Sequence, residues 1–103
     1  MTIRDDILDV AKKTVSKSRE ATYGPPIENF SNCASLWTAY ICAKFGGAIV
    51  DPLQLQLSAE DVAHLNVLQK MARTMGPKVS TDTYVDMAGY SALAAECHYE
   101  EIE

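Results

Sequence analysis

The chain has 103 residues, of which 48% are hydrophobic and 22% charged, and its formal net charge is −5 at pH 7. This length predicts a single domain over residues 1–103, and the three widely spaced cysteines favour free thiols and a cytoplasmic protein. An acidic chain without a long apolar run or a signal peptide argues against a nucleic acid polymer or a membrane as partner.

Two helices are predicted in the first half of the chain. The first spans residues 2–17, where Thr2 can cap and apolar side chains recur at helical spacing. Gly24 and two prolines then interrupt the pattern, and a second helix runs from about Pro26 to Phe45. One stripe of this helix carries its larger apolar residues, which are Phe30, Ala34, Trp37, Ile41 and Phe45.

Two further helices are predicted in the second half. After a loop over residues 48–56, Ser58 caps a third helix that stops at Gly76 and Pro77. A fourth helix runs from about Asp82 to Tyr99. Four helices with short connections predict an all-α four-helix bundle, and such a thin core favours a homo-oligomer.

Acidic side chains interrupt the apolar stripes of the last two helices. In the third helix Leu65, Leu68, Ala72 and Met75 form the stripe expected to face the core, and Asp61 falls on it. In the fourth helix Asp86 lies on the apolar side, one turn after Asp82. Carboxylates from two helices would suit Mg²⁺, so these three aspartates are the candidate metal ligands. The alternative for Asp61 and Asp82 is a capping role in the first helical turn, and for Asp86 an ion pair.

Other side chains are candidates for binding a phosphate-bearing ligand. Lys70 and Arg73 are spaced i, i+3 on the flank of the third helix beside Asn66, and ammonium and guanidinium groups bind phosphate oxygens well. They could also be ordinary solvated cations. Tyr23 and Trp37 could stack on a base, although aromatic residues at helical spacing are more often core residues. Arg19 completes the candidate binding set.

The acidic pattern resembles the MazG-like, all-α nucleotide pyrophosphohydrolases, whose signature is EExxE, a spacer and ExxD. Residues 60–64, EDVAH, match the first half, and residues 83–86, TYVD, match the second. The resemblance implies a MazG-like fold and a Mg²⁺ ion that activates water and bridges phosphates. His64 and Thr83 stand where that signature has acids, so the implied metal site is eroded. If the chain is an enzyme, Glu60 and His64 are the candidate catalytic residues.

A longer part of the chain resembles small phage and prophage proteins of unknown function. The shared order is R, YG, NF, LW and Y, followed by DVA, KxAR and DxxVDxAGY. The matching residues here begin at Arg19 and end at Tyr90. This resemblance implies a phage-encoded protein acting in the host cell cytoplasm, and it implies no activity.

Three functions follow as hypotheses. The leading one is nucleotide binding without efficient turnover, such as sequestration of a cyclic or other host signalling nucleotide in an anti-defence role. It rests on the eroded acidic motif beside the retained pair Lys70 and Arg73. The second is a Mg²⁺-dependent nucleoside triphosphate pyrophosphohydrolase. The third is a helical protein–protein interaction module.

Overall fold

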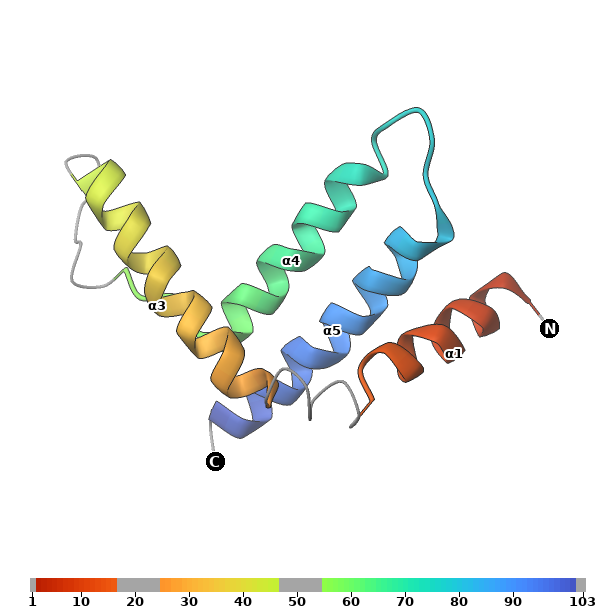
Figure 1. Cartoon of the computed structure of the whole chain (residues 1–103), viewed down its shortest axis with the longest axis horizontal. Helices are drawn as coiled ribbons and strands as arrows, with labels where there is room; N and C mark the ends of the chain where they lie inside the picture. The colour runs from red at the N-terminus through yellow and green to blue at the C-terminus, as the bar shows by residue number, and fades with distance from the viewer. Residues whose placement is uncertain (1, 17–24, 47–54, 102–103) are drawn as a thin grey trace.

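The computed structural model describes residues 2–16, 25–46 and 55–101, and within these ranges the chain is entirely helical. Figure 1 shows the four helices, and no strand occurs among the described residues. The helices are α1 (Ile3–Thr14), α3 (Pro26–Phe45), α4 (Ala59–Arg73) and α5 (Thr81–Glu101). The predicted all-α class and the four helices are therefore confirmed, with ends that differ from the predicted ones by a few residues at most.

Local sequence signals explain where three of the helices begin. α1 and α4 both start with a reciprocal capping box, formed by Thr2 with Asp5 and by Ser58 with Asp61. In each box the hydroxyl accepts from the third helical N–H while the carboxylate accepts from the capping N–H. α3 has no such side-chain cap and begins at Pro26, because proline needs no hydrogen-bond partner in the first turn.

The helices pack in a row rather than around one shared axis. α4 and α5 form an antiparallel hairpin, α1 packs against α5, and α3 packs mainly against α4. Figure 1 shows α3 and α4 diverging like the arms of a V from a common lower end. The backbone N–H of Leu57, just before α4, donates to the hydroxyl of Thr38 in α3 at 3.0 Å. The predicted bundle is thus an open arrangement, in which α1 lies on the far side of α5 from α4.

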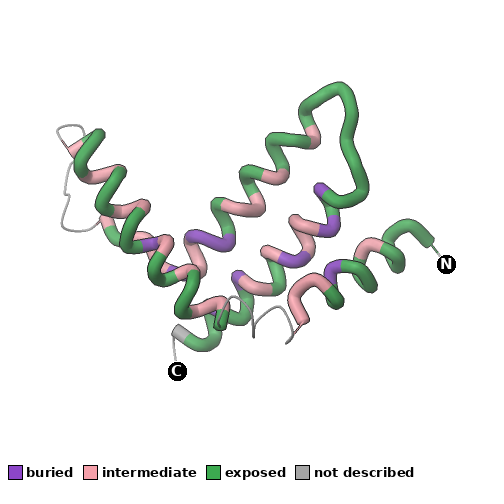
Figure 2. Tube along the Cα trace, in the orientation of Figure 1, coloured by how far each residue is buried: buried purple, intermediate pink, exposed green. Residues whose placement is uncertain are grey.

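The buried core consists mainly of small side chains. Figure 2 shows buried positions near the start of α4 and along one side of α5. The buried hydrophobic residues are Ala11, Ala34, Ala59, Val62, Ala63, Val85, Ala94 and Cys97. Gly89 is also buried, and a Cβ atom added there would lie 3.4 Å from a methyl group of Val15. Small residues allow helix backbones to approach closely, and this close approach sets the packing of α1, α4 and α5.

The structure corrects the predicted core face of the third helix. α4 buries Ala59, Val62 and Ala63, whereas the predicted stripe of Leu65, Leu68, Ala72 and Met75 is exposed. α4 has apolar residues on two sides, and the side with the smaller residues packs against the other helices of the chain. In α3 the prediction is better, since Ala34 is buried and Phe30, Trp37 and Ile41 are half-buried. Phe45, at the end of that stripe, is exposed.

None of the helices in the described ranges combines the length and the apolar character that crossing a membrane requires.

Candidate functional site

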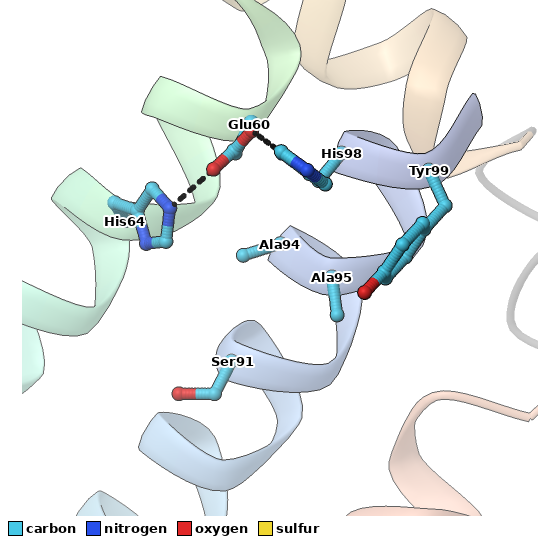
Figure 3. A pocket seen from close by; sticks show the side chains of 7 residues that line it. All are labelled: Glu60, His64, Ser91, Ala94, Ala95, His98 and Tyr99. Carbon is cyan, nitrogen blue, oxygen red and sulfur yellow. Dashed lines mark hydrogen bonds and ion pairs between the residues drawn. The ribbon is translucent and has the colours of Figure 1, made fainter. Parts of the chain in front are cut away.

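A hollow between α4 and α5 is the candidate site. Its volume is about 270 Å³, and it lies where the first turns of α4 meet the last turns of α5. Figure 3 shows the seven side chains that line it: Glu60, His64, Ser91, Ala94, Ala95, His98 and Tyr99. The two alanines leave room for the hollow, and the other five side chains bring polar atoms to it.

Glu60 holds an imidazole on each side. Its Oε2 atom lies 2.9 Å from Nε2 of His64, one turn along α4, and its Oε1 atom lies 2.7 Å from Nδ1 of His98 on α5. The hydrogen bond from His64, followed by that from His98, holds the pKa of Glu60 below the ordinary carboxyl value of 4.5. The carboxylate is therefore kept ionised, and it ties the two helices together at this end of the hairpin.

These two contacts leave the opposite ring nitrogens available. His64 engages through Nε2 and His98 through Nδ1, so Nδ1 of His64 and Nε2 of His98 have no hydrogen bond among the described residues. The ring of Tyr99 packs edge-on against His98, with 5.2 Å between ring centroids. A carboxylate that orients an imidazole fixes which nitrogen can serve a ligand. The site can therefore present two oriented imidazole nitrogens to a bound molecule.

A second polar contact lies further along the same hairpin. Nζ of Lys70 lies 3.1 Å from Oδ2 of Asp86, with side-chain exposures of 14% and 35% respectively. Lys70 thus points toward α5 and neutralises Asp86, which matches the ion-paired alternative for that aspartate. Arg73 is exposed near the end of α4, and the Asn66 amide donates to the backbone carbonyl of Val62 at 2.9 Å. Lys70 and Asn66 thus already have partners within the chain, and their joint phosphate binding with Arg73 stays a prediction.

The three aspartates predicted as metal ligands are not brought together. Asp61 accepts the backbone N–H of Ser58 at 2.9 Å and caps α4, which is the capping alternative. Glu60 meets His98 while Lys70 meets Asp86, so α4 and α5 run antiparallel with Asp61 and Asp86 at different levels. Nine residues separate Asp61 from Lys70, which is about 14 Å along the helix axis. The idea that Asp86 is the counterpart of Asp61 is wrong for this reason.

The residues present therefore do not fit the magnesium site that the MazG-like resemblance implies. Asp82 is exposed in the first turn of α5, close in sequence to Asp86 but at the opposite end of the hairpin from Asp61. Within the described ranges, no three His, Cys, Asp or Glu side chains are grouped so that they could hold a metal ion.

The aromatic candidates are spread over several places. Trp37 is half-buried in α3, and it does not line the hollow. Arg19 and Tyr23 lie outside the described residues. Phe30 of α3 and Tyr90 of α5 pack at 6.3 Å between ring centroids, which makes Tyr90 part of the α3–α5 contact.

Sequence reasoning missed five of the seven residues of the hollow, namely Ser91, Ala94, Ala95, His98 and Tyr99. Glu60 and His64 were found because they stand at i, i+4 within one helix. A signal for His98 existed: an antiparallel hairpin places the end of the fourth helix beside the start of the third. It requires the register between the two helices, which periodicity alone does not supply.

Comparison with known proteins places the chain among phage-type proteins. The family described as "Domain of unknown function (DUF6378)" matches residues 6–98. The chain belongs to this family. It is 32% identical over 99 residues to the Gene 55 protein of Mycobacterium phage D29, and 34% identical over 97 residues to that of Mycobacterium phage L5.

These alignments cover 96% and 94% of the chain but only 58% and 55% of the two relatives. The chain thus spans little more than half the length of the curated relatives it matches. No solved structure matches it. The predicted likeness to small phage proteins of unknown function is confirmed, and the resemblance to MazG-like enzymes stays a prediction.

Proposed function

We propose that this chain binds a phosphate-bearing nucleotide in the hollow between α4 and α5 and holds it without efficient turnover. One observation carries the proposal: Glu60 anchors His64 through Nε2 and His98 through Nδ1, and the other nitrogen of each ring has no hydrogen bond among the described residues. The ligand class, a phosphate-bearing nucleotide, is the one predicted from the sequence. The proposed binding residues are now His64 and His98 in place of Lys70 and Arg73.

The chemistry of the lining suits such a ligand. Imidazole N–H groups and the Ser91 hydroxyl donate hydrogen bonds, and phosphate and ribose oxygens accept them. Tyr99 provides an exposed aromatic ring at the rim of the hollow. A volume of about 270 Å³ lies just below the usual range of roughly 300–1,000 Å³ for small-molecule sites. It therefore favours a mononucleotide over a larger dinucleotide.

Binding is favoured over hydrolysis by the placement of the acids. Asp61 is engaged in the α4 cap and Asp86 in the ion pair with Lys70, so neither is presented to the hollow. A phosphate held by neutral or protonated imidazoles has no clustered carboxylates beside it to bind the metal of a pyrophosphohydrolase. Because the relatives are phage proteins, we propose sequestration of a host signalling nucleotide in the cytoplasm of the infected cell.

The test is a ligand panel with two readouts. The purified chain is mixed with nucleoside mono- and triphosphates, cyclic nucleotides and inorganic phosphate, in the presence of Mg²⁺, Mn²⁺ or EDTA. Thermal unfolding and product formation are measured on the same samples. A ligand present at 100 times its Kd should stabilise the fold by about 2.7 kcal/mol, in EDTA as well as in Mg²⁺.

Two conservative variants separate ligand contact from support of the fold. His98→Asn can keep a donor near the position of Nδ1 while removing Nε2, and His64→Gln can keep the donor near Nε2 while removing Nδ1. Both should weaken nucleotide binding with little change in unfolding temperature without ligand. Tyr84→Phe, on an exposed part of α5 outside the hollow, is the matched control and should bind as the wild type does.

Two other outcomes of the ligand panel would support the pyrophosphohydrolase or the protein–protein interaction module instead. Metal-dependent release of pyrophosphate or nucleoside monophosphate would overturn sequestration and support the pyrophosphohydrolase. Absence of stabilisation by every nucleotide and by phosphate would overturn ligand binding and support the protein–protein interaction module.

A further inference from the structure

α4 carries an apolar stripe that no other described segment covers. Leu65 and Leu68 are exposed, Met75 just after the helix is 81% exposed, and Ala72 between them is exposed as well. At 100° per residue this stripe lies roughly opposite Lys70, the residue that points toward α5. The stripe therefore faces away from α5.

We propose that a second copy of this chain packs its own α4 against this stripe, in antiparallel orientation about a two-fold axis. The spacing of residues 65, 68, 72 and 75 alternates three and four, which is the a/d pattern of helices that pack side by side. In an antiparallel pair centred between Leu68 and Ala72, Leu68 of one copy contacts Ala72 of the second copy, and Ala72 contacts the second copy's Leu68. Leu65 likewise meets the second copy's Met75. The surface is thus self-complementary, as a two-fold interface must be.

The helix dipoles favour the antiparallel direction, because they are opposed in this arrangement. The charge of Lys70 does not enter the contact, because this side chain lies opposite the stripe and pairs with Asp86 of α5.

The area available agrees with a dimer. The accessible surface of the chain is 7426 Å², whereas a folded monomer of 11.3 kDa exposes about 5,700 Å². The excess of roughly 1,700 Å² exceeds the 800 Å² or so that each partner buries in a standard interface. The radius of gyration of 15.6 Å is likewise larger than the value of about 13 Å for a compact domain of this length. An interface of standard size would bury about half of this excess on each chain.

Sedimentation velocity across a wide range of protein concentrations tests the proposal directly. We expect a dimer that dissociates on dilution, together with an unfolding temperature that rises with protein concentration. Leu68→Glu places a charge in the centre of the stripe and should weaken the dimer by about 100-fold or more. Leu36→Glu, at a 71% exposed leucine on α3, is the matched control and should leave the dimer unchanged.

Cross-linking tests the direction of packing. A mixture of Leu65→Cys and Met75→Cys chains should form a disulfide between the two variants, faster than either variant forms one alone. A monomer at all concentrations, with a concentration-independent unfolding temperature, would overturn the proposal. A dimer that Leu36→Glu disrupts and Leu68→Glu does not would overturn it as well, because α3 would then be the interface. If Leu68→Glu fails to fold, the concentration dependence of the wild type and the cross-link still decide.

Discussion

Lys70 of α4 and Asp86 of α5 form an ion pair across the hairpin, with 3.1 Å between Nζ and Oδ2. Lys70 is the more buried partner, at 14% exposure against 35% for Asp86. The two side chains therefore depend on the ion pair to different extents. Without its partner, Lys70 could reach water only by leaving its packing contacts, whereas Asp86 already contacts solvent.

Removing each partner in turn should therefore have unequal effects. We expect Asp86→Asn to lower the free energy of unfolding by about 1–2 kcal/mol, since it leaves Lys70 buried without its counter-ion. Lys70→Met should cost less than about 1 kcal/mol, because the methionine keeps most of the packing and Asp86 can be hydrated. Urea unfolding of both single variants and of the double variant measures the coupling. Equal costs for the two single changes would contradict this account.

The Ser58 and Asp61 capping box should contribute to stability and not to ligand binding. Ser58→Ala removes the acceptor for the Asp61 N–H and should cost about 1 kcal/mol. Asp82→Asn, an exposed first-turn acid of α5, is the control and should change stability by no more than about 0.5 kcal/mol. Chemical unfolding gives the stabilities, and the nucleotide panel gives the binding. A loss of nucleotide binding larger than the loss of stability would contradict a purely structural role of the capping box.

Stability should depend on pH through Glu60. Its pKa is lowered in the folded chain, first by the hydrogen bond with His64 and then by that with His98. Between the ordinary carboxyl value of 4.5 and the lower folded value, the unfolded chain binds more protons than the folded one. The contribution of Glu60 is thus fully present above the unfolded pKa and is lost as the pH falls through the folded pKa.

The measurement is urea unfolding from about pH 3 to pH 7 for the wild type and for Glu60→Gln. The wild type should lose stability more steeply on the acidic limb than the variant. Parallel curves for the two proteins would show that Glu60 is not the group responsible.

Gly89 should tolerate one methyl group and not a larger side chain. A Cβ atom there meets Cγ1 of Val15 at 3.4 Å, close to ordinary van der Waals contact. Gly89→Ala should therefore be neutral or stabilise by up to about 1 kcal/mol, because alanine is the better helix former. Gly89→Leu should destabilise by about 1–3 kcal/mol by overpacking the contact between α1 and α5. Thermal unfolding followed by circular dichroism distinguishes the two changes, and equal effects would contradict the proposed contact.

Sequence patterns predicted the helices better than they predicted their faces. Capping residues and the glycine and proline breaks are local signals, and they located all four helices. The core face of α4 was mispredicted because Leu65 and Leu68 dominate a periodic count, while the contacts are made by Val62 and Ala63. Burial of small residues depends on how closely two backbones approach, which is a property of the assembled hairpin.

In the candidate site, too, contacts within one helix could be predicted and contacts between helices could not. Glu60 and His64 could be found because they lie one turn apart on one helix. His98 could not, because its contact with Glu60 spans 38 positions and depends on the register between α4 and α5. The predicted partnership of Asp61 with Asp86 failed for that same reason.

The contact between α1 and α5 joins the first and last of the described helices. During synthesis on the ribosome, α1 emerges long before the helix that covers Ala11 and Val15. α3 and the hairpin of α4 with α5 can form from neighbouring segments, but α1 docks only once α5 has left the exit tunnel. α1 must therefore remain undocked until α5 has been synthesised, so the folding of this end of the chain waits for a helix about 80 residues later.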